Sequence, residues 1–388
     1  MKVVLDSTEI VSHGNLRSPT YERLFQAVTD GVLTVYVPQV VLDEVLHHRR
    51  REIQQELEKI AKNLDTLYQW GATRYTRLTA AEALQIAQSY QRDVMARMNE
   101  AGVPVLPYPA VAHQRLNEMA SLRRKPFNNK GGGYKDALIW FSVLELAQAS
   151  TDSIVLVSSN SDDFASEAKD ALHSDLASVM QELGVPEGRV TWCNGLAALI
   201  ESLPVVEPAG EEAADGLQVV ESLDWNTVLR ERLPEQVIGK PWEPKEIGLG
   251  SSFRSVTLDQ VTAIGSFEIH SISGTELGRY FVSGHTEMDC VFKFTTLAEQ
   301  WSRCFSEHGD IILKSESPPF QYVTGTLRHH VRGLLHANVG GAPLEVREIE
   351  LAGIVNPNTG SIAISRTSDQ EAAEILAMNQ PPPMASRF

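Results

Sequence analysis

This chain of 388 residues has little cysteine and no long apolar run. Its three cysteines, Cys193, Cys290 and Cys304, contain no CxxC pair and make no even-numbered set, which excludes a disulfide framework. No apolar stretch approaches the roughly 20 residues that span a bilayer. The N-terminus opens on a strand-like segment instead of the charged and apolar regions of a signal peptide. We therefore expect a cytoplasmic protein with no membrane partner.

Positive charge is also scarce, since 34 Lys and Arg face 50 Asp and Glu, for a formal net charge of -16. This balance argues against a protein whose whole surface holds nucleic acid. Two local basic stretches remain, His47 to Arg51 and Arg123 to Lys125 with Lys130 nearby. Each is either a solvated face of a helix or loop, or a local patch that contacts a polyanion.

Several familiar phosphate and metal motifs are missing. The run Gly131-Gly132-Gly133 is not followed by Gly-Lys-Ser/Thr, so it is no Walker phosphate loop, and we expect a flexible or tight approach to a helix start. The histidine and cysteine spacings match no zinc pattern. Asp6-Ser7-Thr8 lacks the second carboxylate that a haloacid-dehalogenase-like phosphatase needs.

The composition is that of a folded protein with two domains, because 43% of the residues are hydrophobic and 22% charged. Residues 1–203 alternate strand and helix signals, which predicts a three-layer α/β/α domain with a mainly parallel sheet. The expected strands are 3–5, 33–37, 154–157 and 190–192. The expected helices are 21–30, a long helix that begins at Pro38 and ends at Gly71, 80–100, 137–147, 165–183 and 196–203.

The C-terminal part has a different character. Residues 204–216 are rich in Pro, Gly and acid and are expected to be a linker. Residues 217–379 cluster β-forming residues between turn signals, which predicts a mostly antiparallel β domain. The expected strands are 256–264, 266–272, 280–282, 289–294, 321–327 and 344–354. Residues 380–388 are expected to be a disordered tail.

Acidic residues recur where expected strands end or helices begin. Asp6 follows the first strand, Glu44 lies just past the second, Asp136 heads an apolar helix, and Asp162 and Asp163 follow the strand at 154–157. In an open parallel sheet the carboxyl ends of strands converge on one crevice. Two carboxylates about 4 Å apart repel by roughly 4 kcal/mol at an effective dielectric near 20. A bound cation removes this repulsion, and oxygen ligands suit Mg²⁺ or Mn²⁺.

These motifs together resemble a PIN domain over residues 1 to about 200. The resemblance rests on Val-Leu-Asp6-Ser-Thr, on Pro38-Gln-Val-Val-Leu-Asp-Glu44-Val, on Lys135-Asp136-Ala-Leu-Ile and on Ser-Asn160-Ser-Asp162-Asp163-Phe164. It is most similar to the branch with a long helical insertion and a Gly-rich segment before the third acidic position. It does not reach the C-terminal half.

The resemblance implies a metal-dependent nuclease that cuts single-stranded RNA, with Mg²⁺ or Mn²⁺ as cofactor and a toxin-like or defence role as one setting. Asp6, Glu44 and Asp136 match the first three acidic positions of the family. At the fourth position many members read Thr-Asn-Asp-x-Asp-Phe, whereas this chain has Ser161 at the first of those aspartates. Asp162, Asp163 or Asn160 could complete the metal shell, and we favour Asp163 as the fourth catalytic residue.

The same hypothesis assigns secondary roles. Ser7, Thr8, Ser159 or Asn160 would orient water and phosphate. The basic side chains at Arg49, Arg50, Arg51, Lys130 and Lys135 would contact the RNA backbone, and Tyr134 or Phe127 would stack on a base. Asp at turns and helix starts also has a purely structural explanation.

Two functions from different classes therefore stay open. The first is a metal-dependent endoribonuclease whose β domain selects substrate, restrains activity, binds a regulatory protein or mediates homo-oligomerisation. The second is an inactive PIN-like scaffold that binds RNA or protein, in which Ser161 has cost metal affinity. Metal binding separates the two, because an active site should be stabilised by Mn²⁺.

Overall fold

The computed structural model describes residues 1–12, 16–69, 80–128, 132–205, 211–242, 244, 247–250, 252–253, 255–274, 279–297, 300, 311–317, 322–358 and 362–363. The chain divides into two compact units. Unit 1 is Met1–Arg17 with Tyr21–Leu199, and unit 2 is Ser18–Thr20 with Ile200–Phe388. The domain boundaries expected from the sequence stay predictions, and the expected tail at 380–388 lies outside the described residues.

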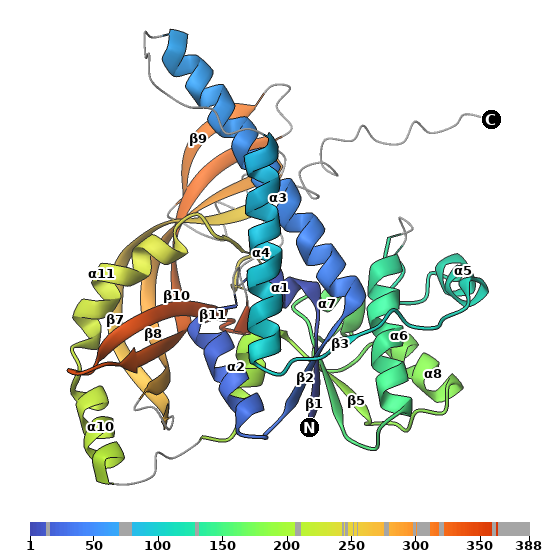
Figure 1. Ribbon diagram of the computed structural model, residues 1–388. Helices are drawn as coiled ribbons and strands as arrows, with labels where there is room; N and C mark the ends of the chain where they lie inside the picture. Colours follow the sequence, from blue (N-terminus) through green and yellow to red (C-terminus); the bar gives the residue numbers. More distant parts are fainter. Residues whose placement is uncertain are drawn as a thin grey trace. The chain divides into compact units, whose positions relative to one another are not determined.

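Unit 1 is built on a parallel sheet in the order β3-β2-β1-β4-β5 (Figure 1). The strands are β1 Lys2–Leu5, β2 Thr34–Pro38, β3 Val105–Leu106, β4 Ile154–Val157 and β5 Val190–Cys193. Every neighbouring pair is parallel, and Val3 faces Val35 on one side and Val155 on the other. Strands buried on both faces read as continuous apolar runs, which explains Val3-Val4-Leu5 at 2% exposure or less.

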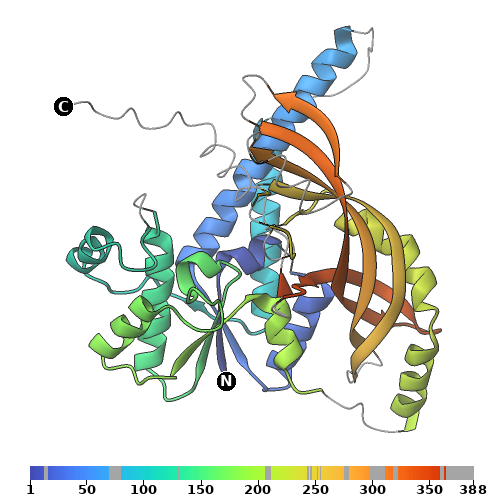
Figure 2. The ribbon, with the colours of Figure 1, turned by 180° about the vertical axis from the view of Figure 1, so that it is seen from behind.

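Helices flank this sheet, as the three-layer α/β/α prediction required. They are α1 Ser7–Ser12, α2 Pro19–Thr29, α3 Gln39–Gln69, α4 Ala80–Glu100, α5 His113–Ser121, α6 Tyr134–Gln148, α7 Ser161–Phe164, α8 Ser174–Glu182 and α9 Gly195–Ser202. Nine residues of helix α6 are buried. The long helices α3 and α4 run side by side (Figures 1 and 2).

The helix expected at 165–183 was wrong in its first half, before α8 begins at Ser174. The structure has the single turn α7, then an irregular segment with an isolated bridge between Ala165 and Leu172, and then α8. Lys169 has a positive φ of 57°, which a continuous right-handed helix does not allow. His173 instead starts α8 by accepting a hydrogen bond from the Asp175 amide at 3.1 Å.

Unit 2 contains an antiparallel sheet in the order β12-β11-β10-β8-β7-β6, with β9 paired to β10. Its strands are β6 Pro241–Trp242, β7 Ser255–Gly274, β8 Tyr280–Leu297, β9 Ile311–Ser317, β10 Tyr322–Gly340, β11 Glu345–Val355 and β12 Ile362–Ala363. Burial alternates along much of β8, so one face of the sheet is packed and the other is polar. The predicted antiparallel β domain is confirmed in its fold class.

The elements of unit 2 differ from the expected ones in two ways. The strands expected at 256–264 and 266–272 form one strand, β7, because Gly265 marks a register irregularity instead of a turn. The strands expected at 280–282 and 289–294 likewise belong to one strand, β8. Two helices were missed, α10 Glu211–Ser222 and α11 Trp225–Val237, and residues 211–216 of the expected linker belong to α10. Leu229, Leu233 and Val237 of α11 are fully buried in the hydrophobic core of unit 2.

Two observations bear on the cysteine and membrane predictions. Cys193 and Cys290 are free thiols, while Cys304 lies outside the described residues. Within the described part of the chain, none of the helices is both long and apolar enough to cross a bilayer.

Candidate active site

The strand order of unit 1 reverses between β1 and β4, and this is where the acidic residues gather. In the sheet, β2 and then β3 lie on one side of β1, whereas β4 and then β5 lie on its other side. In open α/β sheets such a switch point leaves a crevice at the carboxyl ends of the two strands. Asp6 follows β1 and Ser158 follows β4, and the Ser158 hydroxyl donates to Asp6 Oδ2 at 2.6 Å. One hydrogen bond therefore joins the two sides of the switch point.

Asp6 is a buried carboxylate with 1% exposure. Besides Ser158, it accepts the Ser7 amide at 2.6 Å and the Thr8 hydroxyl at 3.1 Å. Burial raises the pKa of Asp6 to about 6, although the hydrogen bonds from Ser158 and Ser7 act in the opposite direction. The negative charges of Glu44 and Glu9 raise this pKa further.

Asp136 stands in the first turn of α6, where the peptide dipoles favour a negative charge. Gly133 positions this turn with a φ of 106° and packs so closely that a Cβ atom would lie 2.2 Å from the Pro126 carbonyl oxygen. The tight approach expected of the glycine run is therefore seen at Gly133. Burial raises the pKa of Asp136 well above its usual value, and the charges of Asp6, Asp163 and Glu44 raise it further.

The segment after β4 contributes Asp163 through the short helix α7. Asn160 Nδ2 donates to Asp163 Oδ2 at 2.9 Å, and Lys125 Nζ lies 3.9 Å from Asp163 Oδ1. Burial raises the pKa of Asp163, while Asn160 and Lys125 oppose this rise. The side chain of Asp162 is exposed. Its charge is not among those that raise the pKa of Asp136, which are the charges of Asp6, Asp163 and Glu44.

Glu44 reaches the same crevice from α3. Its carboxylate pairs with Lys135 Nζ at 2.6 Å, and its charge raises the pKa of both Asp6 and Asp136. Lys135 directly precedes Asp136, so this ion pair links α3 to the start of α6. The lysine is a cation that compensates part of the excess negative charge.

The donor set suits a hard divalent cation, since carboxylate and hydroxyl oxygens are what Mg²⁺ and Mn²⁺ prefer. Three carboxylates that raise the pKa of a fourth are the charge pattern that such a cation relieves. As the side chains stand, however, no three His, Cys, Asp or Glu groups among the described residues are close enough to hold a metal ion. Lys135 and Asn160 hold two of the carboxylates instead.

The other predicted contacts fall into three groups. Ser7, Thr8, Ser159 and Asn160 surround the Asp6 crevice, where Ser159 donates its amide to Glu9 Oε1 at 2.8 Å. Arg49 instead stacks on the Tyr90 ring of α4 at 4.8 Å and pairs with Glu52 at 2.7 Å, while Arg50 is exposed. Lys130 lies outside the described residues. Phe127 is only 3% exposed, so its ring is too buried for the base-stacking role predicted for it.

Glu9 and Ser158 were missed by the sequence reasoning. Glu9 is fully buried and accepts the amides of Ser159 at 2.8 Å and Leu196 at 2.7 Å. It thereby fastens α1 to the ends of β4 and β5. The spacing Asp6-x-x-Glu9 was a usable signal, but it predicts a local capping box, in which the glutamate returns to the Asp6 amide. That amide donates to Val157 O instead.

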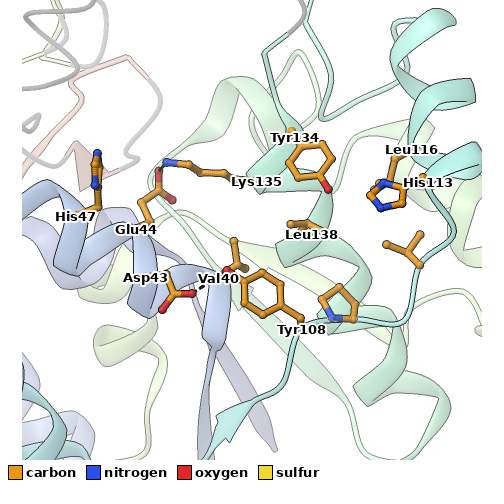
Figure 3. Close-up of a pocket in the computed structure, with 12 residues that line it drawn as sticks. Val40, Asp43, Glu44, His47, Tyr108, His113, Leu116, Tyr134, Lys135 and Leu138 are labelled. Carbon is orange, nitrogen blue, oxygen red and sulfur yellow. Dashed lines mark hydrogen bonds and ion pairs between the residues drawn. The ribbon is translucent and has the colours of Figure 1, made fainter.

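A pocket of about 600 Å³ adjoins the carboxylates, and Glu44 and Lys135 form one of its sides (Figure 3). Its other lining residues come from α3, from the segment between β3 and α5, from α5 and from α6. They are Val40, Asp43, His47, Tyr108, Pro109, Val111, His113, Leu116, Tyr134 and Leu138.

The comparisons with known proteins agree with this geometry. Residues 3–164 match the family model of the PIN domain. This part of the chain is a PIN domain, and the match indicates nuclease-type activity in general, with divalent metal ions as the usual cofactor of the family. The match ends at the α7 residue Phe164, so it leaves unit 2 unassigned. No curated protein and no solved structure matches the chain.

Proposed function

We propose that unit 1 is a Mg²⁺- or Mn²⁺-dependent endoribonuclease that hydrolyses phosphodiester bonds of single-stranded RNA. The observation that carries the proposal is the convergence of four carboxylates from separate parts of the fold: Asp6 after β1, Glu44 on α3, Asp136 on α6 and Asp163 on α7. Burial raises the pKa of Asp136, and the charges of the other three residues raise it further. Carboxylates that converge at a topological switch point make an energetically unfavourable cluster unless a cation joins them.

Asp6, Glu44, Asp136 and Asp163 are the residues that would hold the metal. A divalent ion in such a site lowers the pKa of a water nucleophile and neutralises charge that develops on the phosphate and the leaving oxygen. Glu44 would exchange Lys135 for the metal, and Asp163 would turn from Lys125. The two released ammonium groups could then contact phosphate oxygens of the RNA.

The hydrogen bonds around Asp6 have a positioning role in this proposal. Ser158, Thr8 and the Ser7 amide hold the two Asp6 oxygens at the crevice. Such fixed donors orient a metal ligand and tune its basicity. Because Asp6 is only 1% exposed, its electrostatic interactions are stronger than they would be in water.

The experiment that tests the proposal is cleavage of a labelled, mixed-sequence single-stranded RNA in Mn²⁺, Mg²⁺ or EDTA. Asp136→Asn keeps the size of the side chain and removes its charge. We expect cutting that needs the metal and that falls about a hundredfold to a thousandfold in the variant, because transition-state charge stabilisation of this kind contributes roughly 3–4 kcal/mol. Full activity of a folded Asp136→Asn protein would contradict the site.

A catalytically inert scaffold is the second candidate, and one observation favours it. Among the described residues no three candidate ligands are close enough for a metal as placed, and Ser161 stands where many PIN domains have an aspartate. The scaffold predicts no thermal shift with Mn²⁺. The nuclease predicts stabilisation by about 2.7 kcal/mol at a free Mn²⁺ concentration of 100 times the dissociation constant.

The partners and the setting of the protein belong to the same proposal. Unit 2 would select RNA, bind a regulatory protein or mediate homo-oligomerisation, and a cytoplasmic setting with a toxin-like or defence role fits an RNA-cutting activity. The free thiols of Cys193 and Cys290 are compatible with a reducing compartment.

A further inference from the structure

The pocket beside Glu44 and Lys135 contains two exposed aromatic side chains. Tyr108 is 50% exposed and Tyr134 is 47% exposed, although large aromatic residues are usually more buried. Figure 3 shows the two rings on opposite sides of Leu138. Val40, Leu116 and Leu138 form a buried apolar floor with 8% exposure or less. A flat, apolar ligand would therefore find aromatic rings at its sides and aliphatic groups beneath it.

The polar rim of the pocket combines the carboxylates of Asp43 and Glu44 with the side chains of His47, His113 and Lys135. Asp43 is exposed there, and it accepts the Tyr108 hydroxyl at 2.7 Å and the Gln39 amide nitrogen at 2.8 Å. A carboxylate has about four lone-pair sites, so two sites remain to accept hydrogen bonds from a ligand. The Tyr108 hydroxyl bond also fixes the orientation of that ring relative to Asp43.

The pocket is continuous with the candidate catalytic centre. Glu44 lines the pocket and also raises the pKa of Asp6 and Asp136. Lys135 lines it as well and is the residue before Asp136. A ligand in the pocket would thus lie next to the carboxylates. This position suits one unit of a polymer whose neighbouring backbone linkage lies over the carboxylates.

From these observations we infer that the pocket binds one unpaired nucleobase of the strand being cut. The base stacks on Tyr108 and Tyr134 and directs an amino group to Asp43, while Lys135 contacts its phosphate. This inference rests on the proposed nuclease function. A volume of about 600 Å³ accommodates a base with its sugar, since small-molecule pockets are typically about 300–1,000 Å³.

The carboxylate of Asp43 makes the pocket selective. Adenine, cytosine and guanine carry an exocyclic amino group that can donate to Asp43. Uracil has only its N3–H, which is flanked by two carbonyl oxygens that a carboxylate repels. The pocket therefore favours the three amino-bearing bases over uracil. It also requires an unpaired strand, because a base within a duplex is already paired and stacked and cannot stack on the two tyrosines.

Binding without cleavage tests the inference. Labelled oligoadenylate, oligocytidylate, oligouridylate and an abasic ribose-phosphate oligomer would be titrated by fluorescence anisotropy into the full chain in EDTA. We expect oligoadenylate and oligocytidylate to bind about tenfold more tightly than the abasic oligomer, since stacking on one aromatic contributes roughly 1–3 kcal/mol per base. Oligouridylate, which stacks but has no amino group to donate to Asp43, should bind between them.

Variants assign the binding to the pocket. Tyr108→Ala and Tyr134→Ala should each weaken oligoadenylate binding about tenfold and leave abasic binding unchanged, while Tyr134→Phe should bind like the natural chain. Asp43→Asn should reduce the discrimination against uracil, because an amide both donates and accepts. Leu122→Ala, at a residue with 69% exposure outside the pocket, is the matched control.

The outcomes separate this inference from the nuclease proposal. A protein that cuts RNA with Mn²⁺, but whose tyrosine variants bind and cut unchanged, would overturn the pocket and leave the nuclease standing. Tyrosine-dependent binding in a protein that never cuts would support the pocket and overturn the nuclease. Equal binding of abasic and natural oligomers, or binding to none of them, would overturn the pocket.

Discussion

At the scale of single residues, the central feature is a carboxylate that is buried more deeply than its charge favours. Asp6 has 1% exposure and a pKa of about 6, against an ordinary value of 3.8. A folded-state pKa raised in this way means that the native protein binds more protons than the unfolded chain between these values. Stability from Asp6 is therefore complete below about pH 3.8 and is lost as the pH rises through about 6.

The Asp6→Asn variant should accordingly be more stable than the natural protein at neutral pH in EDTA. The rise of the pKa of Asp6 from 3.8 to about 6 corresponds to roughly 3 kcal/mol of stability, which the natural protein loses when Asp6 ionises. The amide of the variant does not ionise, so the variant avoids this loss. The gain should appear between pH 4 and pH 7 in urea unfolding and be small at pH 4. A difference in stability that is the same at both pH values would contradict the buried, ionised Asp6.

The sequence predicts single residues of the candidate site where residue type and position along the chain are sufficient signals. Asp6, Glu44, Asp136 and Asp163 were chosen because they follow strands or head helices, and the structure brings their charges within mutual influence. Their catalytic and metal-binding roles stay predictions. Glu9 escaped because its partners, the amides of Ser159 and Leu196, are 150 and 187 residues away in the chain. No local pattern encodes contacts of that range.

At the scale of elements, the start of α6 decides where Asp136 stands. Gly133 combines a positive φ with a close approach to the Pro126 carbonyl oxygen, so both backbone and space exclude a side chain. Gly31 is the natural comparison, because its φ is 70° and a Cβ there would meet none of the described atoms within 4 Å. A comparison of substitutions at Gly133 and Gly31 therefore separates the cost of backbone strain from the cost of a steric clash.

Gly133→Ala should cost roughly 3 kcal/mol or more, because overpacking adds to the strain of a left-handed conformation. Gly31→Ala should cost only about 1–2 kcal/mol from the strain alone. Chemical denaturation measures both, and Mn²⁺ titration should show weakened binding only in Gly133→Ala. Equal losses of stability in the two variants would show that the contact with Pro126 does not constrain α6.

Element boundaries show why sequence patterns gave the right class and some wrong limits. Glycines were interpreted as turns, yet Gly265 and Gly284 lie inside β7 and β8, where a Cβ at Gly284 would lie 2.4 Å from the Glu268 carbonyl oxygen. Close backbone approach needs glycine just as a turn does, and the sequence alone does not distinguish the two. Helix α11 was missed because neighbouring β signals dominated the interpretation of unit 2.

At the scale of the whole molecule, each unit has its own hydrophobic core. Unit 2 packs α11 against β7 and β11, and unit 1 buries its parallel strands between helices. Chains with two cores commonly depart from two-state unfolding. A metal bound by carboxylates of unit 1 would stabilise that unit alone, because ligand binding adds free energy only where the site is formed.

Calorimetry of the full chain should therefore show a transition that rises in temperature with Mn²⁺ and a second one that does not. The metal-dependent rise should vanish in Asp136→Asn, which identifies its transition as that of unit 1. A rise that persists in this variant would place the metal elsewhere in the molecule.

The two neighbouring aspartates after β4 offer the most direct test of the central claim, that a carboxylate-held metal in the Asp6 crevice cuts RNA. Asp163 is largely buried and influences the pKa of Asp136, whereas the Asp162 side chain is exposed. Asp162→Asn is thus a matched control for Asp163→Asn, with the same chemical change one residue away.

The measurement is the single-turnover rate of single-stranded RNA cleavage in saturating Mn²⁺ for the two variants and the natural chain. The account predicts a loss of at least about a hundredfold in Asp163→Asn, consistent with removal of one group that stabilises the transition state, and a near-natural rate in Asp162→Asn. Equal rates in both variants, or a loss confined to Asp162→Asn, would contradict it.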